Sequence, residues 1–358
     1  MESPPTSICL LRLSALGDVS HTVALLRALQ RQWPQASITW VIGKLEYQLV
    51  KNIADVEFVV FDKSQGWGAN RAVWRELKGR RFDVFLLAQA ALRASVLSLG
   101  ISARLRVGFD FRRARDFQWV FTNTKIASTK NQHVLDGLLE FAVAIGVESP
   151  DVQWDIPITD EDRAFAAESL GDTPTLVINA CTSVRARNFR NWRADRYAAV
   201  ADYAHKSYGL QIALTGGPNN IETEMASAIE QKTGAPVLNL VGKTSVAQLY
   251  AILAQSRLTI APDTGPLHLA NAAGVPVIGL YASSNPSRTG PYNARQWVVN
   301  EYPQALKKFM GKSVEQVRWG RRVRDPEALE LIGFDQVIAM LDRVMRETTD
   351  PLDATDPA

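Results

Sequence analysis

Residues 259–274, TIAPDTGPLHLANAAG, mark a passage from a buried strand into a helix. The stretch opens apolar; Pro266 suits the first helical position because its missing N–H needs no partner there, and Gly274 stands where a helix ends. Such a helix directs its first N–H groups beyond the end of the strand and favours an anion by about 0.3–1 kcal/mol per charge. A capped core helix, with Asp263 bonded only to its own backbone, fits the pattern as well.

The composition is that of a globular protein large enough for two domains. The chain has 358 residues, of which 46% are hydrophobic and 22% charged, and its net charge is +3. Cys9 and Cys181 lie far apart in apolar runs without a CxxC pair, so we expect both to be reduced core residues. The four histidines lack the spacing of metal ligands, and we expect no metal site.

The N-terminal residues resemble no targeting signal. They lack the basic and apolar regions of a signal peptide, and no apolar run reaches the roughly 18 residues that a membrane span needs. We therefore expect a cytoplasmic protein.

Strand and helix patterns alternate along both halves of the chain. The first half opens with a strand at 8–13, a helix at about 19–33 and a strand at 37–43, which form a βαβ unit with parallel strands. The second half repeats this scheme from its strand at 175–180 onward. The alternation predicts an α/β protein of two doubly wound domains facing a central cleft. The expected divisions are a first domain at 1–155, a linker at 156–172, a second domain at 173–332, a C-terminal helix at 333–347 and a disordered tail at 348–358.

The loop after the first strand carries Gly17 and Asp18. Ligands of such sheets bind beyond the carboxyl ends of the strands, which makes this loop a candidate site. It lacks the G-x-G-x-x-G pattern, so we do not expect a dinucleotide there. Asp18 suits two roles, a general base or the N-cap of the next helix.

The loop that opens the second half is rich in arginine and hydroxyl groups. Its candidate ligands for a diphosphate are Thr182, Ser183, Arg185, Arg187 and Arg190. A solvated basic loop is the alternative. The position of the loop after a strand favours the binding role.

A glycine turn, Gly216-Gly217-Pro218, follows another strand of the second half. Such a turn lets a ligand approach the backbone, and Glu222 or Glu224 could accept hydrogen bonds from a ribose diol. A plain turn before a helix with acidic residues in its first turn explains the same residues.

Basic residues gather in two further runs. These are Arg104, Arg106, Arg112, Arg113 and Arg115, and then Lys307, Lys308, Lys312, Arg318, Arg321, Arg322 and Arg324. Both runs suit a solvated face, a polyanionic acceptor or an anionic membrane surface. No nucleic-acid-binding motif is present in them, so we do not expect nucleic acid as a partner.

Together these motifs resemble the ADP-heptose:lipopolysaccharide heptosyltransferases of glycosyltransferase family 9. The resemblance rests on LSALGDV at 13–19, on the turn at 216–218 and on DTGPLHLA at 263–270, in this order over nearly the whole chain. It implies a GT-B fold of two Rossmann-like domains, and an inverting, metal-independent transfer of heptose from ADP-heptose to an anionic lipopolysaccharide inner-core acceptor. The basic runs add the expectation of peripheral contact between this cytoplasmic protein and the inner membrane surface.

The family's roles carry over by position. Asp18 corresponds to the base, Glu222 faces the ribose, and the other donor-binding positions include Gly216 and Gly217. Asp263, Thr264, Gly265 and His268 correspond to the residues that hold the sugar and the diphosphate. The expected acceptor-binding residues are Gln89, Arg93, Arg112 and Arg113.

One position departs from the family pattern. A lysine usually stands two residues before the tryptophan of the diphosphate loop, whereas this chain has Arg190 before Trp192. Arg190 can neutralise the leaving diphosphate as a planar fork, and Arg185 or Arg187 could share that role. Another nucleotide-sugar donor and a binding module without turnover remain alternatives. A nicotinamide oxidoreductase is disfavoured, because neither half has the glycine fingerprint.

Overall fold

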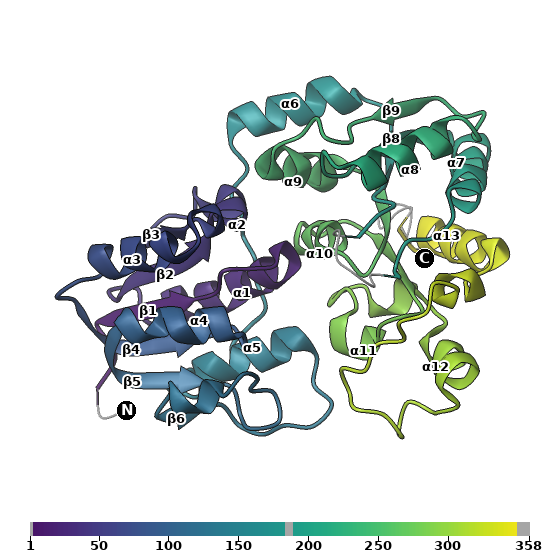
Figure 1. Ribbon diagram of the computed structural model, residues 1–358. Helices are drawn as coiled ribbons and strands as arrows, with labels where there is room; N and C mark the ends of the chain where they lie inside the picture. Colours follow the sequence, from purple (N-terminus) through teal and green to yellow (C-terminus); the bar gives the residue numbers. More distant parts are fainter. Residues whose placement is uncertain (1–2, 183–188, 349–358) are drawn as a thin grey trace, which may run out of the picture. The chain divides into compact units, whose positions relative to one another are not determined.

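The computed structural model describes residues 3–182 and 189–348, which fall into two compact units, Met1–Thr159 and Asp160–Ala358. Each unit is built on a parallel six-stranded sheet with helices packed alongside it (Figure 1). The α/β class expected from the alternating pattern is confirmed. Among the described helices, none has both the length and the apolarity that crossing a membrane requires. Ser183, Arg185 and Arg187, and the predicted tail beyond Thr348, lie outside the described residues.

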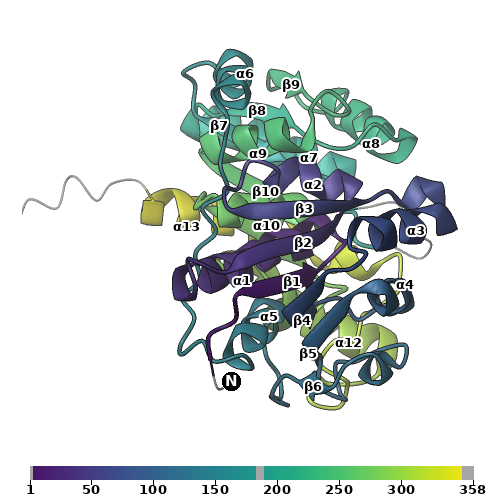
Figure 2. The same ribbon diagram turned by 90° about the vertical axis from the view of Figure 1, so that its left-hand side faces the viewer.

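The first unit has the strand order β3-β2-β1-β4-β5-β6, which Figure 2 shows across the sheet. Its strands are β1 (Ser7–Leu11), β2 (Ser37–Gly43), β3 (Val56–Phe61), β4 (Arg81–Leu87), β5 (Ser102–Gly108) and β6 (Thr124–Lys125). Its helices are α1 (Leu16–Gln32), α2 (Lys44–Val50), α3 (Trp67–Glu76), α4 (Leu92–Leu97) and α5 (Val134–Val143), with short 3-10 turns at Lys63–Gln65, Ser98–Gly100 and Gln118–Val120. Ile8 of β1 stands beside Ile38 and Val84, so the central strand is apolar on both sides.

The second unit has the order β12-β11-β10-β7-β8-β9. Followed from β9, this is the arrangement of the first unit, with β7 in the place of β1 and β10 in the place of β4. Its strands are β7 (Thr175–Ile178), β8 (Gln211–Leu214), β9 (Val237–Asn239), β10 (Leu258–Pro262), β11 (Val277–Tyr281) and β12 (Val298–Asn300). Its helices are α6 (Asp160–Leu170), α7 (Ala194–Tyr208), α8 (Asn220–Glu230), α9 (Val246–Gln255), α10 (Gly265–Ala272), α11 (Pro286–Thr289), α12 (Tyr302–Met310) and α13 (Phe334–Thr348), with 3-10 turns at Arg295–Trp297 and Ala328–Leu331. This strand order is the one of dinucleotide-type Rossmann sheets, whose ligands bind where the order reverses.

The start of α1 differs from the expectation. The helix begins at Leu16 rather than near Val19, because the carbonyl of Ala15 already accepts the first helical bond from the N–H of Val19. Asp18 therefore lies inside the first turn, and Ala15 is the N-cap. The interpretation of Asp18 as the N-cap of this helix is wrong.

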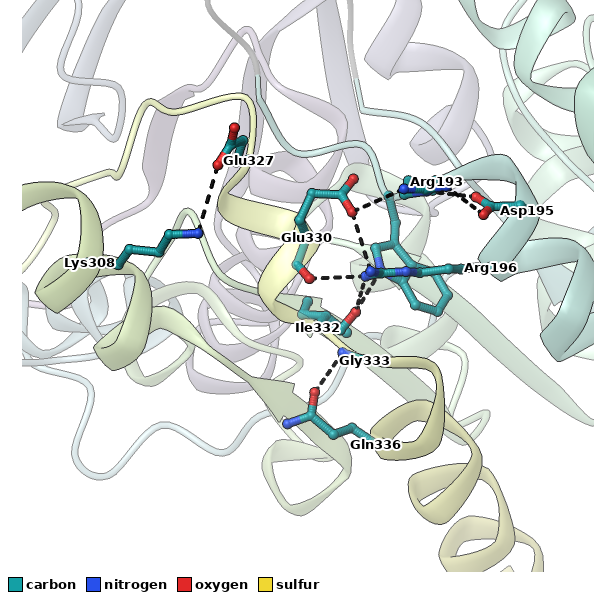
Figure 3. Close-up of polar contacts among 10 residues, drawn as sticks. Arg193, Asp195, Arg196, Lys308, Glu327, Glu330, Ile332, Gly333 and Gln336 are labelled. Carbon is teal, nitrogen blue, oxygen red and sulfur yellow. Dashed lines mark hydrogen bonds and ion pairs between the residues drawn. The ribbon is translucent and has the colours of Figure 1, made fainter.

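Hydrogen bonds and an ion pair hold the segment before α13 against α7. Arg196 donates to the carbonyls of Glu330 and Ile332 and pairs with the Glu330 carboxylate at 3.3 Å (Figure 3). The buried Trp192 donates its Nε1 to the same Ile332 carbonyl at 3.0 Å. These contacts fix the end of the arginine-rich loop, two residues after Arg190, against the core of the second unit.

Candidate active site

Two of the predicted site residues meet where the strand order of the second sheet reverses. Arg190 follows β7 and Asp263 follows β10, and these two strands are neighbours in the sheet. Loops that leave such a pair of strands diverge, and the space between them is the usual ligand position of the fold. The fold therefore joins two residues that are 73 positions apart in the sequence.

Arg190 and Asp263 form a buried ion pair. Arg190 Nη1 donates to the Asp263 carbonyl at 2.5 Å and to its Oδ2 at 3.1 Å, and the two side chains are only 13% and 9% exposed. Ser284 Oγ donates to the same Oδ2 at 2.8 Å, and His268 Nε2 lies 3.7 Å from Oδ1. The N-cap of α10 is Thr264, so Asp263 does not act as a simple cap of that helix.

Burial and the neighbouring charges act in opposite directions on this pair. Burial by itself raises the pKa of Asp263, but His268, Arg190 and Ser284 outweigh it and hold that pKa below its ordinary value. Burial lowers the pKa of the Arg190 guanidinium, and the Asp263 carboxylate counteracts this effect. Both groups are charged at neutral pH, and Asp263 fixes one edge of the guanidinium.

The first turn of α10 lies beside the pair. Thr264 and Gly265 are half-buried, and His268, one turn further on, is buried. The first N–H groups of a helix have no partner inside it, and they form the positive end of the helix dipole. The structure thus gathers Arg190, Asp263, Thr264, Gly265 and His268 into one positively polarised corner.

The glycine turn after β8 folds around Glu222. The Glu222 carboxylate accepts from the N–H of Gly217 at 2.6 Å and from Asn219 Nδ2 at 2.5 Å. A Cβ at Gly216 would lie 2.5 Å from Glu222 Oε2, so a side chain there would displace the Glu222 carboxylate. Asn219 in turn caps α8 by accepting from the N–H of Glu222. Glu222 therefore holds the turn together, a role that the sequence alone does not distinguish from ribose binding.

A small pocket opens next to Glu222. It is lined mainly by apolar side chains from β7, β8 and α8, including Ile178, Leu214 and Ile229, together with Thr215 and Cys181. Burial raises the pKa of the Cys181 thiol to about 12, so this cysteine is a neutral wall of the pocket. Its apolar walls belong to the core, with Ile178 and Ile229 fully buried, so the accessible part of the pocket is its rim beside Glu222.

Thr182 is the part of the predicted diphosphate clamp that is described besides Arg190. It is buried, and its backbone N–H donates to Asn191 Oδ1 at 2.9 Å. Its hydroxyl lies 3.2 Å from the same oxygen. These bonds join the two ends of the loop whose Ser183, Arg185 and Arg187 lie outside the described residues.

In the first unit, Asp18 pairs with a buried arginine. Arg12 Nη2 lies 2.6 Å from Asp18 Oδ2, and the N–H of Ala15 donates to this oxygen at 3.3 Å. Arg12 also donates to the carbonyls of Ser14 at 2.9 Å and Ala88 at 2.6 Å, which ties together the ends of β1 and β4, where the strand order reverses. The Asp18 side chain is 42% exposed, so this anchored carboxylate remains accessible.

The predicted acceptor residues of the first unit have different surroundings. Gln89 Oε1 accepts from the N–H of Leu13 at 2.7 Å, so this side chain supports the loop before Asp18. Arg93 and Arg112 are exposed. Arg113 binds the Asp110 carboxylate in its own loop, and Gln132 and the Ala127 carbonyl in the segment after β6. Arg93 and Arg112 thus remain the accessible candidates.

Sequence reasoning did not single out Arg12 or Ser284. Arg12 interrupts an apolar run, and a lone charge at the end of a buried strand is a signal that could have found it. Ser284 follows β11, so the rule that sites lie beyond strand ends covered it as well.

Comparison with known proteins shows the family of this chain. A family profile described as glycosyltransferase family 9 (heptosyltransferase) matches residues 70–317. The lipopolysaccharide core heptosyltransferase OpsX of Haemophilus influenzae is 36% identical over 341 residues, which cover 95% of this chain and 97% of that protein. The chain belongs to glycosyltransferase family 9.

Solved structures of heptosyltransferases and a related family 9 enzyme have the same fold as this chain. The family 9 glycosyltransferase of Veillonella parvula superposes with a TM-score of 0.80 at 25% identity, over 96% of this chain and 98% of that one. The E. coli heptosyltransferase WaaC, solved with ADP, has a TM-score of 0.71 at 21% identity, over 94% and 99%. The expected GT-B fold of two Rossmann-like domains is confirmed, and the chain is a glycosyltransferase.

Proposed function

We propose that this glycosyltransferase moves heptose from ADP-heptose to an anionic inner-core acceptor of lipopolysaccharide, with inversion and without a metal. The observation that carries the proposal is the buried Arg190–Asp263 pair beside the start of α10, at the switch point of a Rossmann sheet. The names of the relatives support the substrates, since OpsX is a lipopolysaccharide core heptosyltransferase and WaaC was solved with ADP.

The donor's diphosphate binds at the start of α10. Breaking the bond between the sugar and the diphosphate leaves negative charge on the leaving group, which fixed positive groups must stabilise. The N–H groups at Thr264 and Gly265 and the guanidinium of Arg190 supply that stabilisation, and Asp263 keeps Arg190 oriented before the donor arrives. His268, one turn further along α10, faces the sugar.

The nucleoside binds at the rim of the apolar pocket between β7, β8 and α8. Its ring lies against Val241 at this rim, and the ribose diol donates to Glu222. Glu222 is already held by Gly217 and Asn219, so its carboxylate is oriented before the ribose binds.

Asp18 acts as the general base. The acceptor hydroxyl attacks C1 of the heptose, the bond from C1 to the diphosphate oxygen breaks, and ADP leaves with the bonding electrons. Asp18 takes the proton of the hydroxyl, a contribution of about 10²–10⁴-fold in rate for general bases. Arg12 positions this carboxylate, and Arg93 and Arg112 bind the anionic acceptor together with Gln89 and Arg113. One displacement at C1 inverts its configuration.

The enzyme touches the inner membrane surface through a patch of its first domain. The aromatic patch consists of Phe111, Phe117, Trp119 and Val120, all exposed, with Phe111 at 67% and Phe117 at 72%. Its rings contact one another, and Lys125 Nζ lies 3.6 Å from the centre of the Phe111 ring. Arg112 and Arg115, both exposed, stand between the aromatic residues in the sequence. Aromatic rings flanked by cations suit the interface of an anionic bilayer.

Calorimetric titration of donors tests the substrate assignment. ADP-heptose should bind more tightly than UDP-glucose or NAD, because the pocket and Glu222 select the nucleoside and the corner at Asp263 selects the sugar phosphate. Equal affinities, or no binding of ADP-heptose, contradict the assignment. Tight binding without transfer to any acceptor would instead identify a binding module.

A further inference from the structure

A basic pocket, separate from the apolar one beside Glu222, adjoins the Arg190–Asp263 pair. It lies between α11, with Arg288, and the segment that carries Trp319, Arg321 and Arg322. Ser284 belongs to the rim of this pocket, and its hydroxyl donates to Asp263 at 2.8 Å. The pocket and the ion pair therefore share a wall.

The arginine segment is built into the fold. The N–H of Val323 donates to the Ser283 carbonyl at 2.9 Å, and the hydroxyl of the buried Tyr302 donates to the Arg321 carbonyl at 2.8 Å. At Gly320 the backbone approaches Arg288 closely, since a Cβ there would lie 3.3 Å from Arg288 Nε. The segment is thus held by backbone contacts, which leave the arginine side chains to line the pocket.

The charge of this pocket has one sign. Three arginines line it, and none of the residues around it is an aspartate or a glutamate. Within residues 3–182 and 189–348, neither Arg321 nor Arg322 forms an ion pair. Burial lowers the pKa of Arg190, and the positive charge of Arg322 lowers it further. The charge of Arg322 therefore lies near the ion pair. Like charges repel when gathered in this way, and a bound anion removes that repulsion.

We propose that Arg288, Arg321 and Arg322 form a second phosphate-binding site beside the Arg190–Asp263 pair. Guanidinium groups match phosphate oxygens in a planar, two-bonded geometry, and several of them together prefer a group with two negative charges. The identity of the phosphate rests on the proposed function. It is either the sugar-linked phosphate of the donor, which becomes the terminal phosphate of ADP, or a phosphate that the acceptor carries.

The test compares Arg321→Gln/Arg322→Gln with Arg324→Gln. Arg324 is exposed in the same segment and lies outside the pocket, so its variant controls for loss of charge. Inorganic pyrophosphate is titrated first, directly and in the absence of ADP, because this step needs no turnover. We expect the double variant to bind pyrophosphate at least tenfold more weakly, and Arg324→Gln to stay within about twofold of the wild type.

Two further measurements separate the sources of the phosphate. If the site holds the donor, the double variant loses at least tenfold in affinity for ADP and much less for AMP. If it holds the acceptor, ADP binding is unchanged, and KM rises for the intact acceptor but not for a phosphatase-treated one. An unchanged affinity for pyrophosphate in a variant that keeps the wild-type melting temperature overturns the proposal. Loss of pyrophosphate binding without any heptose transfer would leave this site standing and remove the proposed reaction.

Discussion

Arg190 donates to both the backbone carbonyl and the carboxylate of Asp263, and both side chains are almost fully buried. Removing one partner of a buried ion pair costs more stability than the attraction within the pair contributes, because the remaining charge stays buried without a counter-charge. The pair therefore makes the stability of the second domain depend on two residues that the proposed reaction also uses.

Asp263→Asn should destabilise the protein by about 3–5 kcal/mol, because Arg190 then remains buried without its carboxylate. Thermal and urea unfolding measure this loss. Asp195→Asn is the control, since Asp195 forms an ion pair with Arg193 in which both side chains are about half exposed. Its effect should stay below about 1 kcal/mol, and equal losses in the two variants contradict the role assigned to the buried pair.

The same pair predicts a dependence of stability on pH. The pKa of Asp263 is lowered in the folded protein, so its contribution to stability is complete above the pKa of the unfolded chain, about 3.9. That contribution is lost as the pH falls through the lower pKa of the folded state. The difference in unfolding free energy between wild type and Asp263→Asn should therefore be constant from pH 5 to pH 7 and shrink in stronger acid. A difference that grows in acid contradicts the lowered pKa.

Arg190→Ala and Arg190→Lys separate charge from geometry. The alanine variant should lose affinity for ADP and slow the transfer step, because the diphosphate loses a cation. The lysine variant keeps the charge but lacks the planar fork of donors with which arginine can bind Asp263 and a phosphate at the same time. It should therefore recover only part of the rate. Wild-type kinetics in both variants would assign the diphosphate to Arg185 or Arg187.

Glu222→Ala and Glu224→Ala test the ribose assignment on one helix. Glu222 closes the glycine turn beside the pocket, whereas Glu224 is exposed. We expect the first variant to bind ADP at least tenfold more weakly, a loss that a charge-assisted hydrogen bond explains, and the second to match the wild type. The reverse result would move the ribose to Glu224. Titration with 2′,3′-dideoxy-ADP separates ribose contact from a damaged turn, because only direct contact makes the wild type prefer ADP.

Much of the architecture could be predicted from the sequence. Long apolar strands such as β1 and β10, and the helix start at Pro266, carry strong local signals, and the alternation of elements predicts both sheets. Three short elements, β6, β12 and α2, were not predicted. β6 has two residues and β12 has three, which is too short for an alternation of apolar and polar residues to be recognised. α2 follows β2 directly, so no loop residues mark where the helix begins.

The candidate site was predictable in its parts but not in its contacts. Asp263 and Arg190 were each expected to bind the donor, yet no local pattern indicates that they pair, because the pairing depends on the order of β7 and β10. Asp18 was expected at the start of α1, but its partner Arg12 was not, since the ion pair forms across the turn between β1 and α1. Contacts of this kind arise only when the sheet has assembled.

The aromatic patch predicts binding to anionic vesicles. Phe111→Ser/Phe117→Ser should reduce sedimentation with vesicles of phosphatidylglycerol and phosphatidylethanolamine, while ADP affinity stays unchanged. Leu45→Ser is the control, because Leu45 is 57% exposed on α2, outside the patch. Equal vesicle binding by all three proteins contradicts the membrane proposal. Weaker binding to the lipid acceptor in detergent, with vesicle binding unchanged, would assign the patch to the acceptor instead.

The central claim is that this chain transfers heptose with Asp18 as the base. The most direct measurement incubates a truncated lipopolysaccharide acceptor and ADP-heptose with the wild type and with Asp18→Asn, and follows the acceptor by mass spectrometry. We expect the wild type to add one heptose, and the variant to be slower by 10²–10⁴-fold with nearly unchanged affinity for ADP. An acceptor that stays unmodified with the wild type contradicts the proposed reaction, and full activity in Asp18→Asn contradicts the proposed base.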